Sequence, residues 1–354
     1  MLERTHTLVA DVHERLRQFV EPVTESATAR VILAGAGSSA YIGQCLAPVL
    51  DRQLAARVDA VPTTDLVSAP DLYLDARHPL LLVSFGRSGN SPESLAAVNL
   101  VETRIPDCRH LVVTCNAQGA LARIQVRRSM ALQLPEETHD AGFAMTSSFS
   151  CMLYATLAAF SPAQVLDARI QPIAAATAAV IEDARQALQV LAGQRHDRVV
   201  YLGSGPLQGL AREAALKLGE LCNGSVATCF DSTLGFRHGP KTFVTGNTLV
   251  FVFVSNNPLT RSYDHDLVDE LRRDGVAARV IEVTARPRSG ATDNTIVVPE
   301  MAQADDVDLA WPYVAAAQVF ALQASLVRGI TPDNPNPQGM VNRVVQGVRI
   351  HAAA

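Results

Sequence analysis

The segment from Ser84 to Ser94 combines small residues, hydroxyl groups and one arginine. Small residues let backbone amides approach an anion closely, and the hydroxyl groups of Ser88 and Ser91 can donate hydrogen bonds to it. Ser91 precedes a proline, which is typical of a helix start, and a helix N-terminus favours phosphate through its free amides and its dipole. The segment therefore predicts a phosphate site, in which Arg87 pairs with a phosphate oxygen, or else an ordinary capped turn.

A second segment rich in glycine and serine, from Gly35 to Ala40, fits the pattern G-x-G-x-x-A. This pattern is compatible with a dinucleotide site, for which Asp59 or Asp65 could supply the acidic partner of the ribose. A sugar phosphate instead needs hydroxyl and amide donors from two adjacent turns. Ser38 and Ser39 would supply such donors beside the first loop, so the two segments together favour a sugar phosphate.

Two further segments carry groups that can move protons. Glu213, Lys217 and Glu220 are four and three residues apart, so they share one face of a helix. Taken alone, this spacing favours a solvent-exposed charge ladder over a catalytic carboxylate. His238 lies in the loop 231–241 among glycines and other charged residues. Because histidine titrates near neutral pH, His238 is the better candidate for acid or base catalysis of the two segments, although a surface turn would also explain the loop.

The cysteines and histidines show none of the familiar metal-binding spacings. The six cysteines form no C-x-x-C pair, and the nine histidines form no H-E-x-x-H pair. We therefore expect buried thiols, no metal site and no cofactor.

Strands that alternate with helices must position these residues. Apolar runs of strand length lead into glycine-rich turns, and the same order recurs in the second half of the chain. Gly35 and Gly203 are 168 residues apart, Ser84 and Ser255 are 171 apart, and Thr114 and Thr284 are 170 apart. This nearly constant spacing predicts a duplicated α/β domain, with two parallel, doubly wound sheets that bind ligands at the carboxyl ends of their strands.

The pattern also predicts where each part of the chain begins and ends. Strands are expected at 30–34, 80–83, 111–114, 198–202, 249–254 and 278–283. A helical N-terminal segment (1–28) should precede the first domain (29–162), and a helical bridge (163–194) should lead to the second domain (195–330). The proline-rich end of the chain, 331–354, should be an extended tail, because prolines cannot continue a helix.

Bulk composition narrows the class of protein. Hydrophobic residues make up 48% of the chain and charged residues 18%, which is typical of buried α/β sheets. The formal net charge of -5 argues against nucleic acid or an anionic membrane as a partner. The N-terminus mixes charged and apolar residues, unlike a signal peptide, and the longest apolar runs have strand length. We expect a cytoplasmic protein.

Four motifs, taken in order across the repeat, resemble the sugar isomerase (SIS) domain family. These are the G-x-G-S-S turn at 35–39, the S-G-x-S loop at 88–91, the A-L-K-L-x-E helix at 215–220 and the H-G-P loop at 238–240. The longer stretches 84–94, 138–149, 234–241 and 341–348 resemble the AgaS-type members of this family. Those proteins are described as galactosamine-6-phosphate deaminases and were earlier labelled tagatose-6-phosphate ketose/aldose isomerases. The resemblance covers almost the whole chain.

The resemblance implies a role for each of the residues that match. Ser39, Ser88 and Ser91 fall on phosphate-binding positions, with Arg87 and Ser38 beside them. Glu220 falls on the carboxylate that moves a proton between C1 and C2 of the sugar, which reverses the expectation from spacing alone. His238 falls on the histidine that helps to open the sugar ring.

The resemblance implies the conversion of galactosamine 6-phosphate to tagatose 6-phosphate and ammonia. Isomerisation of an aldose and a ketose 6-phosphate without loss of nitrogen uses the same proton shuttle and is the alternative. A non-catalytic sugar-phosphate sensor is a third interpretation. The roughly 30 residues before the first strand are few for a DNA-binding domain, which counts against the sensor.

Two SIS domains in one chain also resemble the isomerase half of glucosamine-6-phosphate synthases, and two departures from those synthases bear on the reaction. The synthases end in a tail that carries a lysine, whereas the matching stretch here reads Val341-Asn342-Arg343-Val344. No glutaminase domain is expected before the first SIS domain, which disfavours synthesis. SIS proteins are often homodimers or larger homo-oligomers that share residues between subunits, so His238 could act on the substrate of the neighbouring chain.

Overall fold

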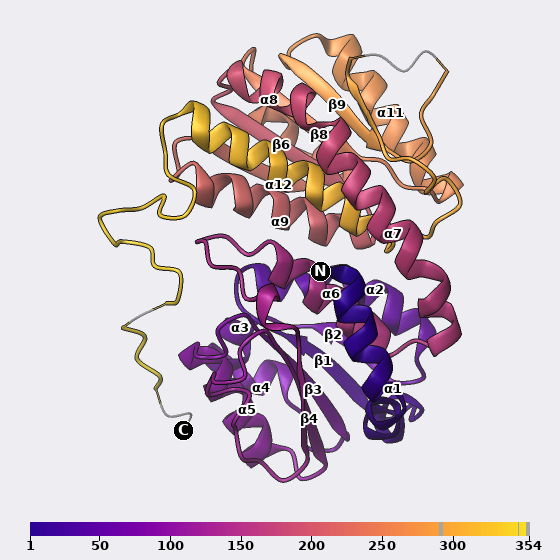
Figure 1. Cartoon of the computed structure of the whole chain (residues 1–354), viewed down its shortest axis with the longest axis vertical. Coiled ribbons are helices and arrows are strands. Elements are labelled where there is room, and N and C mark those ends of the chain that lie inside the picture. Colours follow the sequence, from indigo (N-terminus) through magenta and orange to yellow (C-terminus); the bar gives the residue numbers. More distant parts are fainter. Residues whose placement is uncertain (290–292, 346, 352–354) are drawn as a thin grey trace. The chain divides into compact units, whose positions relative to one another are not determined.

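A computed structural model of the protein describes residues 1–289, 293–345 and 347–351. The chain forms two compact units (Figure 1). The first unit comprises Met1–Ala141, Met145–Ile170 and Gly339–Ala354, and the second comprises Gly142–Ala144 and Gln171–Gln338. Each unit is built on one five-stranded parallel sheet, as the alternation of strands and helices predicts.

The first unit has the strand order β2-β1-β3-β4-β5. The strands are β1 (Arg30–Ala34), β2 (Arg57–Ala60), β3 (Leu80–Gly86), β4 (Cys108–Thr114) and β5 (Ser129–Gln133). The helices are α1 (Leu2–Thr24), α2 (Ser38–Gln53), α3 (Thr63–Ser68), α4 (Pro70–Tyr73), α5 (Pro92–Arg104) and α6 (Ser147–Ala159), with a 3-10 turn, η1 (Glu136–Thr138). The central strand β3 is buried along nearly its whole length, as expected for a parallel strand covered on both faces.

The order of the first sheet reverses between β1 and β3. Ala34 pairs with Ser84 in register, so the two strands end side by side. The chain leaves them in opposite directions across the sheet, towards β2 and towards β4. Such a switch point, at the carboxyl ends of parallel strands, is where doubly wound sheets bind ligands.

The second unit repeats this topology with the order β10-β9-β8-β6-β7. The strands are β6 (Arg198–Gly203), β7 (Ala227–Asp231), β8 (Thr248–Phe253), β9 (Arg279–Thr284) and β10 (Thr295–Val297). The helices are α7 (Ala163–Asp183), which begins in the first unit, α8 (Arg185–Gly193), α9 (Pro206–Leu221), α10 (Thr233–Phe236), α11 (Pro258–Asp274) and α12 (Ala310–Val327), with a 3-10 turn, η2 (Pro240–Phe243). The predicted duplication is therefore present in the sheet topology.

Helix α12 is long and apolar enough to cross a membrane by composition, but 72% of its apolar window is buried inside the protein. Its Phe320 packs on Phe251 of β8, and its Tyr313 stacks on Phe253 of the same strand. Figure 1 shows α8, α9 and α12 over one face of the second sheet. We conclude that α12 is a core helix of the second unit.

The six predicted strands are present, and the predicted N-terminal helix is α1. The bridge predicted at 163–194 consists of α7 and α8. The described part of the segment 331–354 contains no helix. The limits of the SIS domains stay a prediction, because the compact units divide the chain differently and assign residues 339–354 to the first unit.

Candidate functional site

The predicted phosphate loop leads from β3 to α5 at the switch point of the first sheet. Ser91 is the N-cap of α5 and Pro92 is its first residue, as predicted. The hydroxyl group of Ser91, however, makes no capping hydrogen bond, and it donates instead to Glu93 Oε2 at 2.7 Å. The amides at the start of α5 are thus left without a side-chain cap, which suits an anion site.

Neighbouring backbone fixes the shape of this loop. The side-chain amide of Asn116 donates to Ser88 O at 2.8 Å, and the amide of Leu121 donates to Gly89 O at 2.8 Å. A Cβ atom at Gly119 would lie 2.4 Å from Ser88 O, so only glycine permits this close approach. Gly89 has a φ of 66°, a conformation that glycine adopts at little cost. The loop is therefore held from below by the segment that follows β4.

Ser38 and Ser39 are the first two residues of α2 and are both buried. A Cβ atom at Gly35 would lie 2.5 Å from the Cβ of Ser39, which explains the glycine at the start of this turn. Because β1 and β3 pair and end together, the turn at Ser38 and the loop at Ser88 leave adjacent strands at one end of the sheet. The structure thus brings the two predicted serine-rich turns to the same edge.

The alternative dinucleotide site lacks a free acidic partner at the end of β2. Both oxygens of Asp59 are engaged by guanidinium groups: Arg30 binds Oδ2 at 2.7 Å and Arg57 binds Oδ1 at 3.1 Å. Asp65 lies within α3 rather than at the end of the strand. A carboxylate neutralised in this way is a poor acceptor for a ribose hydroxyl. The structure therefore supports the sugar-phosphate interpretation of this edge.

Arg87 is 7% exposed and meets two segments that sequence spacing did not connect to it. Its guanidinium donates to Arg343 O at 3.0 Å, and the Arg343 guanidinium in turn contacts Asp140 O. Burial lowers the pKa of His139, and the positive charges of Arg343 and Arg87 lower this pKa further. The buried Nε2 of His139 has no hydrogen-bond partner among the described residues. His139 is thus a neutral proton acceptor or donor close to Arg87.

Asp140 organises the turn that enters α6. Its carboxylate accepts five hydrogen bonds, from the backbone amides of Thr146, Ser147 and Ser148 and from the hydroxyl groups of Thr146 and Ser148. Burial alone would raise the pKa of Asp140, but the hydrogen bonds from Ser148 and Thr146 outweigh burial and lower it. In the sequence, only the family resemblance marks the stretch 138–149 as part of a site. Its side-chain roles depend on a turn that no local spacing reveals.

The acidic residues of α9 are not the exposed ladder that their spacing favours. Glu213 is 0% exposed and Lys217 is 1% exposed, while the side chain of Glu220 is 25% exposed. The Lys217 ammonium contacts Glu220 Oε2 and lies 3.7 Å from Glu213 Oε1. A buried cation held between two carboxylates is costly to desolvate, so such clusters concentrate at functional sites. Glu220 is the member that solvent, and hence a substrate, can reach.

His238 is exposed and lies between α10 and η2. The residues beside it are anchored to α11: Arg237 Nε binds Glu270 Oε2 at 2.9 Å, and Lys241 binds both Glu270 and Asp274. The anchors flank His238 and leave its imidazole exposed.

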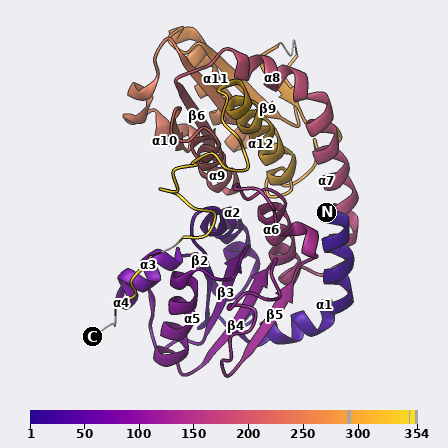
Figure 2. The ribbon, with the colours of Figure 1, turned by 60° about the vertical axis from the view of Figure 1, so that its left-hand side comes forward.

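The helix that carries Glu220 and the helix that precedes His238 pack on opposite faces of the second sheet. Leu218 of α9 lines a small apolar cavity with Val199 of β6 and Phe320 of α12, so α9 covers the face that carries Val199. Phe236 of α10 packs instead with Val200, the next residue of the strand, and successive strand residues point to opposite faces. Figure 2 shows α10 and α12 on opposite sides of β6. The second unit therefore does not bring the two predicted catalytic residues together.

Comparison with known proteins agrees with these features. The chain matches the SIS domain model over residues 26–162. It is 47% identical over 352 residues to D-galactosamine-6-phosphate deaminase AgaS of Escherichia coli O157:H7, which covers 98% of this chain and 92% of the relative. A protein of the same name from Shewanella sp. (strain ANA-3) is 44% identical over 338 residues, covering 94% of this chain and 84% of the relative. The chain belongs to the AgaS family of SIS-domain proteins.

One similar solved structure carries the name of a different activity. The crystal structure titled tagatose-6-phosphate ketose/aldose isomerase from Escherichia coli matches with a TM-score of 0.89 and 44% sequence identity, over 99% of this chain and 92% of that chain. The relatives of this AgaS-type chain thus carry both names, deaminase and isomerase. Both names describe enzymes that act on phosphorylated sugars.

The switch point of the second sheet differs from that of the first in this AgaS-type chain. The fully buried Asp264 of α11 accepts hydrogen bonds there from Ser255 N at 2.9 Å, Thr233 Oγ1 at 2.8 Å and Ser204 Oγ at 3.4 Å. Burial raises the pKa of Asp264 to about 6. A carboxyl group thus uses the donors that a phosphate would need, so an anion site is expected only in the first unit.

Proposed function

We propose that this protein deaminates galactosamine 6-phosphate to tagatose 6-phosphate and ammonia. The observation that carries the proposal is the pair of serine-rich turns at the switch point of the first sheet, in a chain 47% identical over nearly its full length to a named deaminase of this substrate. The phosphate would bind to Ser38, Ser39, Ser88 and Ser91 and to the amides at the start of α5, with Arg87 beside them. Binding energy at the phosphate, remote from the reacting carbons, would then orient C1 and C2.

Glu220 is the proposed proton shuttle. In the open-chain sugar it would remove the C2 proton to give an enaminol and return that proton to C1, which leaves an imine at C2. Water then adds to the imine carbon, and ammonia leaves as the C2 ketone forms. The Lys217 ammonium contacts Glu220 Oε2 and would hold the carboxylate in place for both proton transfers.

His238 is proposed to assist ring opening from the neighbouring subunit of a homodimer. In its own chain the second sheet lies between α9, which carries Glu220, and α10, which precedes His238, and the residues beside His238 are anchored to α11. An exposed, rigid loop is able to reach a site on a second copy of the chain.

We also propose that this homodimer is cytoplasmic and that it binds neither nucleic acid nor membrane, in agreement with the net charge of -5.

The decisive experiment supplies the purified protein with galactosamine 6-phosphate, glucosamine 6-phosphate and tagatose 6-phosphate, and follows ammonia and ketose formation separately. We expect ammonia and ketose to appear in equal amounts from galactosamine 6-phosphate. A Ser88→Ala variant is the matched control, because loss of a phosphate contact should raise KM with little change in kcat. Turnover of glucosamine 6-phosphate in preference to galactosamine 6-phosphate would overturn the substrate assignment.

Ketose/aldose isomerisation is the second candidate function, and the name of the similar Escherichia coli structure, tagatose-6-phosphate ketose/aldose isomerase, favours it. The same proton shuttle serves both reactions, so the site alone does not separate them. Interconversion of tagatose 6-phosphate with an aldose, without ammonia from any amino sugar, would establish the isomerase. Binding of these sugars without any turnover would instead identify a sensor.

A further inference from the structure

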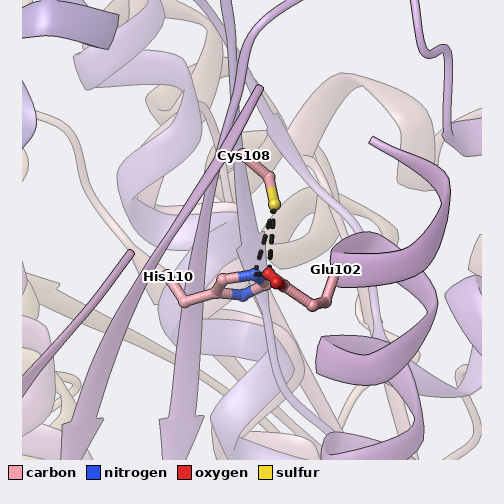
Figure 3. A group of neighbouring side chains, drawn as sticks. All are labelled: Glu102, Cys108 and His110. Atoms are coloured by element: carbon pink, nitrogen blue, oxygen red, sulfur yellow. Dashed lines mark hydrogen bonds and ion pairs between the residues drawn. The ribbon is translucent and has the colours of Figure 1, made fainter. Parts of the chain in front are cut away.

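Three side chains with metal-binding atoms meet at the amino end of the first sheet, the end opposite the phosphate loop. Glu102 belongs to the last turn of α5, and Cys108 and His110 belong to the first half of β4 (Figure 3). Cys108 and His110 are two residues apart on a strand, so they point to the same face, towards α5. Cys108 is 2% exposed and His110 is 0% exposed.

The spacing of the three ligand atoms fits a tetrahedral zinc ion. His110 Nε2 lies 3.2 Å from Glu102 Oε2, Cys108 Sγ lies 3.4 Å from that same oxygen, and Cys108 Sγ lies 3.5 Å from His110 Nε2. With usual zinc bond lengths, tetrahedral geometry places nitrogen and oxygen ligands about 3.3 Å apart and sulfur about 3.5 Å from either. All three edges of the triangle agree with these separations, so an ion could enter without moving the backbone.

Only one of the two carboxylate oxygens of Glu102 faces the other two residues of the cluster. Arg127 Nε binds Glu102 Oε1 at 2.5 Å, which leaves Oε2 as the atom that faces both Cys108 and His110. Without an ion, the thiol and the imidazole compete for this single oxygen. His110 Nδ1 is buried and has no hydrogen-bond partner among the described residues, so Nε2 makes the polar contacts of the ring. The side chain of Glu102 is 18% exposed, so one of the three proposed ligands reaches solvent.

We propose that Glu102, Cys108 and His110 form a zinc site with a water molecule as fourth ligand. A thiolate, an imidazole and a carboxylate together select Zn²⁺ over Mg²⁺ or Ca²⁺, which prefer oxygen ligands alone. The Cys108 proton leaves to solvent when the thiolate binds the ion. The ion would join the end of α5 to the start of β4, far along the sheet from the phosphate loop. Because His110 Nδ1 has no hydrogen-bond partner in the part of the chain that the structure describes, we expect micromolar rather than tighter affinity.

Cobalt and zinc titrations of the full-length, tag-free protein test the site after removal of metal by a chelator. Co²⁺ should bind with one ion per chain and produce a thiolate-to-cobalt charge-transfer band together with the visible bands of tetrahedral cobalt. Competition with a chromophoric chelator gives the dissociation constant of Zn²⁺. Cys108→Ser should remove the charge-transfer band and weaken Zn²⁺ binding by about 100-fold. Glu102→Gln should keep the band and weaken the binding.

Cys229→Ser is the matched control, because Cys229 is the partly exposed cysteine and lies outside the cluster. This variant should titrate like the wild-type protein. Circular dichroism of each variant shows whether the fold is retained, and the retained band in Glu102→Gln reports on the site even if Cys108→Ser fails to fold. A charge-transfer band that persists in Cys108→Ser, or wild-type protein without this band, would overturn the proposal and leave a hydrogen-bonded triad only.

Discussion

At the residue scale, the cluster on α9 carries the proposed chemistry. Lys217 is buried between the carboxylates of Glu213 and Glu220, and only Glu220 reaches solvent. Removing the charge of one member changes the electrostatic balance of the other two, because buried charges are stabilised mainly by their partners. Substitutions at Glu220 should therefore be isosteric, so that loss of the proton shuttle is separated from loss of the fold.

Glu220→Gln should lower kcat by about 1,000-fold, within the usual range for removal of a general base. The affinity for galactosamine 6-phosphate should change little, because the amide keeps the shape of the side chain and the phosphate contacts lie elsewhere. Steady-state ammonia release gives kcat, and calorimetric titration with substrate gives the affinity. The control is Glu182→Gln on the exposed surface of α7. An undiminished kcat in Glu220→Gln would remove this residue from the mechanism.

Local patterns in the sequence predicted where several of the candidate site residues lie in the fold. Ser38, Ser39, Ser88 and Ser91 follow strands directly, so their place at the sheet edge could be deduced from strand-turn-helix order alone. His139 and Arg343 were missed because they approach Arg87 from remote parts of the chain. Likewise, no spacing rule joins Glu102 on a helix to Cys108 and His110 on the next strand, and the expectation of no metal site depended on such rules.

At the element scale, the strands that the sequence failed to predict are the edges of the two sheets. They are β2 and β5 in the first sheet and β7 and β10 in the second. These strands have three to five residues each and are partly exposed, so they lack the continuous apolar run of a central strand. The central strands β3 and β8 are buried almost throughout, and β8 was predicted to within one residue at each end. The predicted β3 ended three residues too early, because Ser84, Phe85 and Gly86 were assigned to the loop but belong to the strand.

Asp264 of α11 should make the free energy of unfolding depend on pH. Its pKa is about 6 in the folded protein, above the ordinary value of 3.8, because the group is buried. As pH rises from 4, the unfolded chain loses this proton first, and the folded chain keeps it until about pH 6. The stability that Asp264 contributes is therefore complete below pH 4 and is lost as pH rises through 6.

Asp264→Asn should stabilise the second unit at pH 7 by on the order of 2 kcal/mol and have a much smaller effect at pH 4. The amide can accept from Ser255 N and donate to the hydroxyl oxygens of Thr233 and Ser204, so the hydrogen bonds are retained. Denaturant unfolding followed by tryptophan fluorescence measures the effect, since the single tryptophan, Trp311, is buried in α12. Asp266→Asn, on the exposed side of α11, is the control. Equal effects at both pH values would contradict the assignment.

At the scale of the whole molecule, the arrangement of the second sheet makes a homodimer part of the proposed mechanism. Glu220 lies on α9 and His238 follows α10, and the second sheet lies between these two helices. The sequence located both residues through family motifs, but it contained no signal for the face of the sheet on which each would lie. That information comes from the packing of α9 against α12 and of α10 against α11.

Mixed dimers of Glu220→Gln and His238→Gln chains test this arrangement. Each homodimer alone should be inactive, whereas co-expression should restore about a quarter of wild-type activity, because half of the dimers then contain one intact site. Ammonia release from the purified mixture is the measurement. Mixing two preparations of the same variant gives the background rate. Absence of any recovery in dimers shown to contain both chains would place both functions within one chain.

The switch point of the second sheet, where Asp264 accepts hydrogen bonds, also shows how the two halves of the repeat differ. Both halves keep the same strand order and the same meeting of two central strands, yet in one half a carboxyl group of α11 uses the donors that an anion would need. One acidic side chain of the second unit thus occupies the place that corresponds to the proposed phosphate site of the first unit. The proposed roles are divided in the same way: the first unit binds the phosphate, and α9 of the second unit carries Glu220, the proposed proton shuttle.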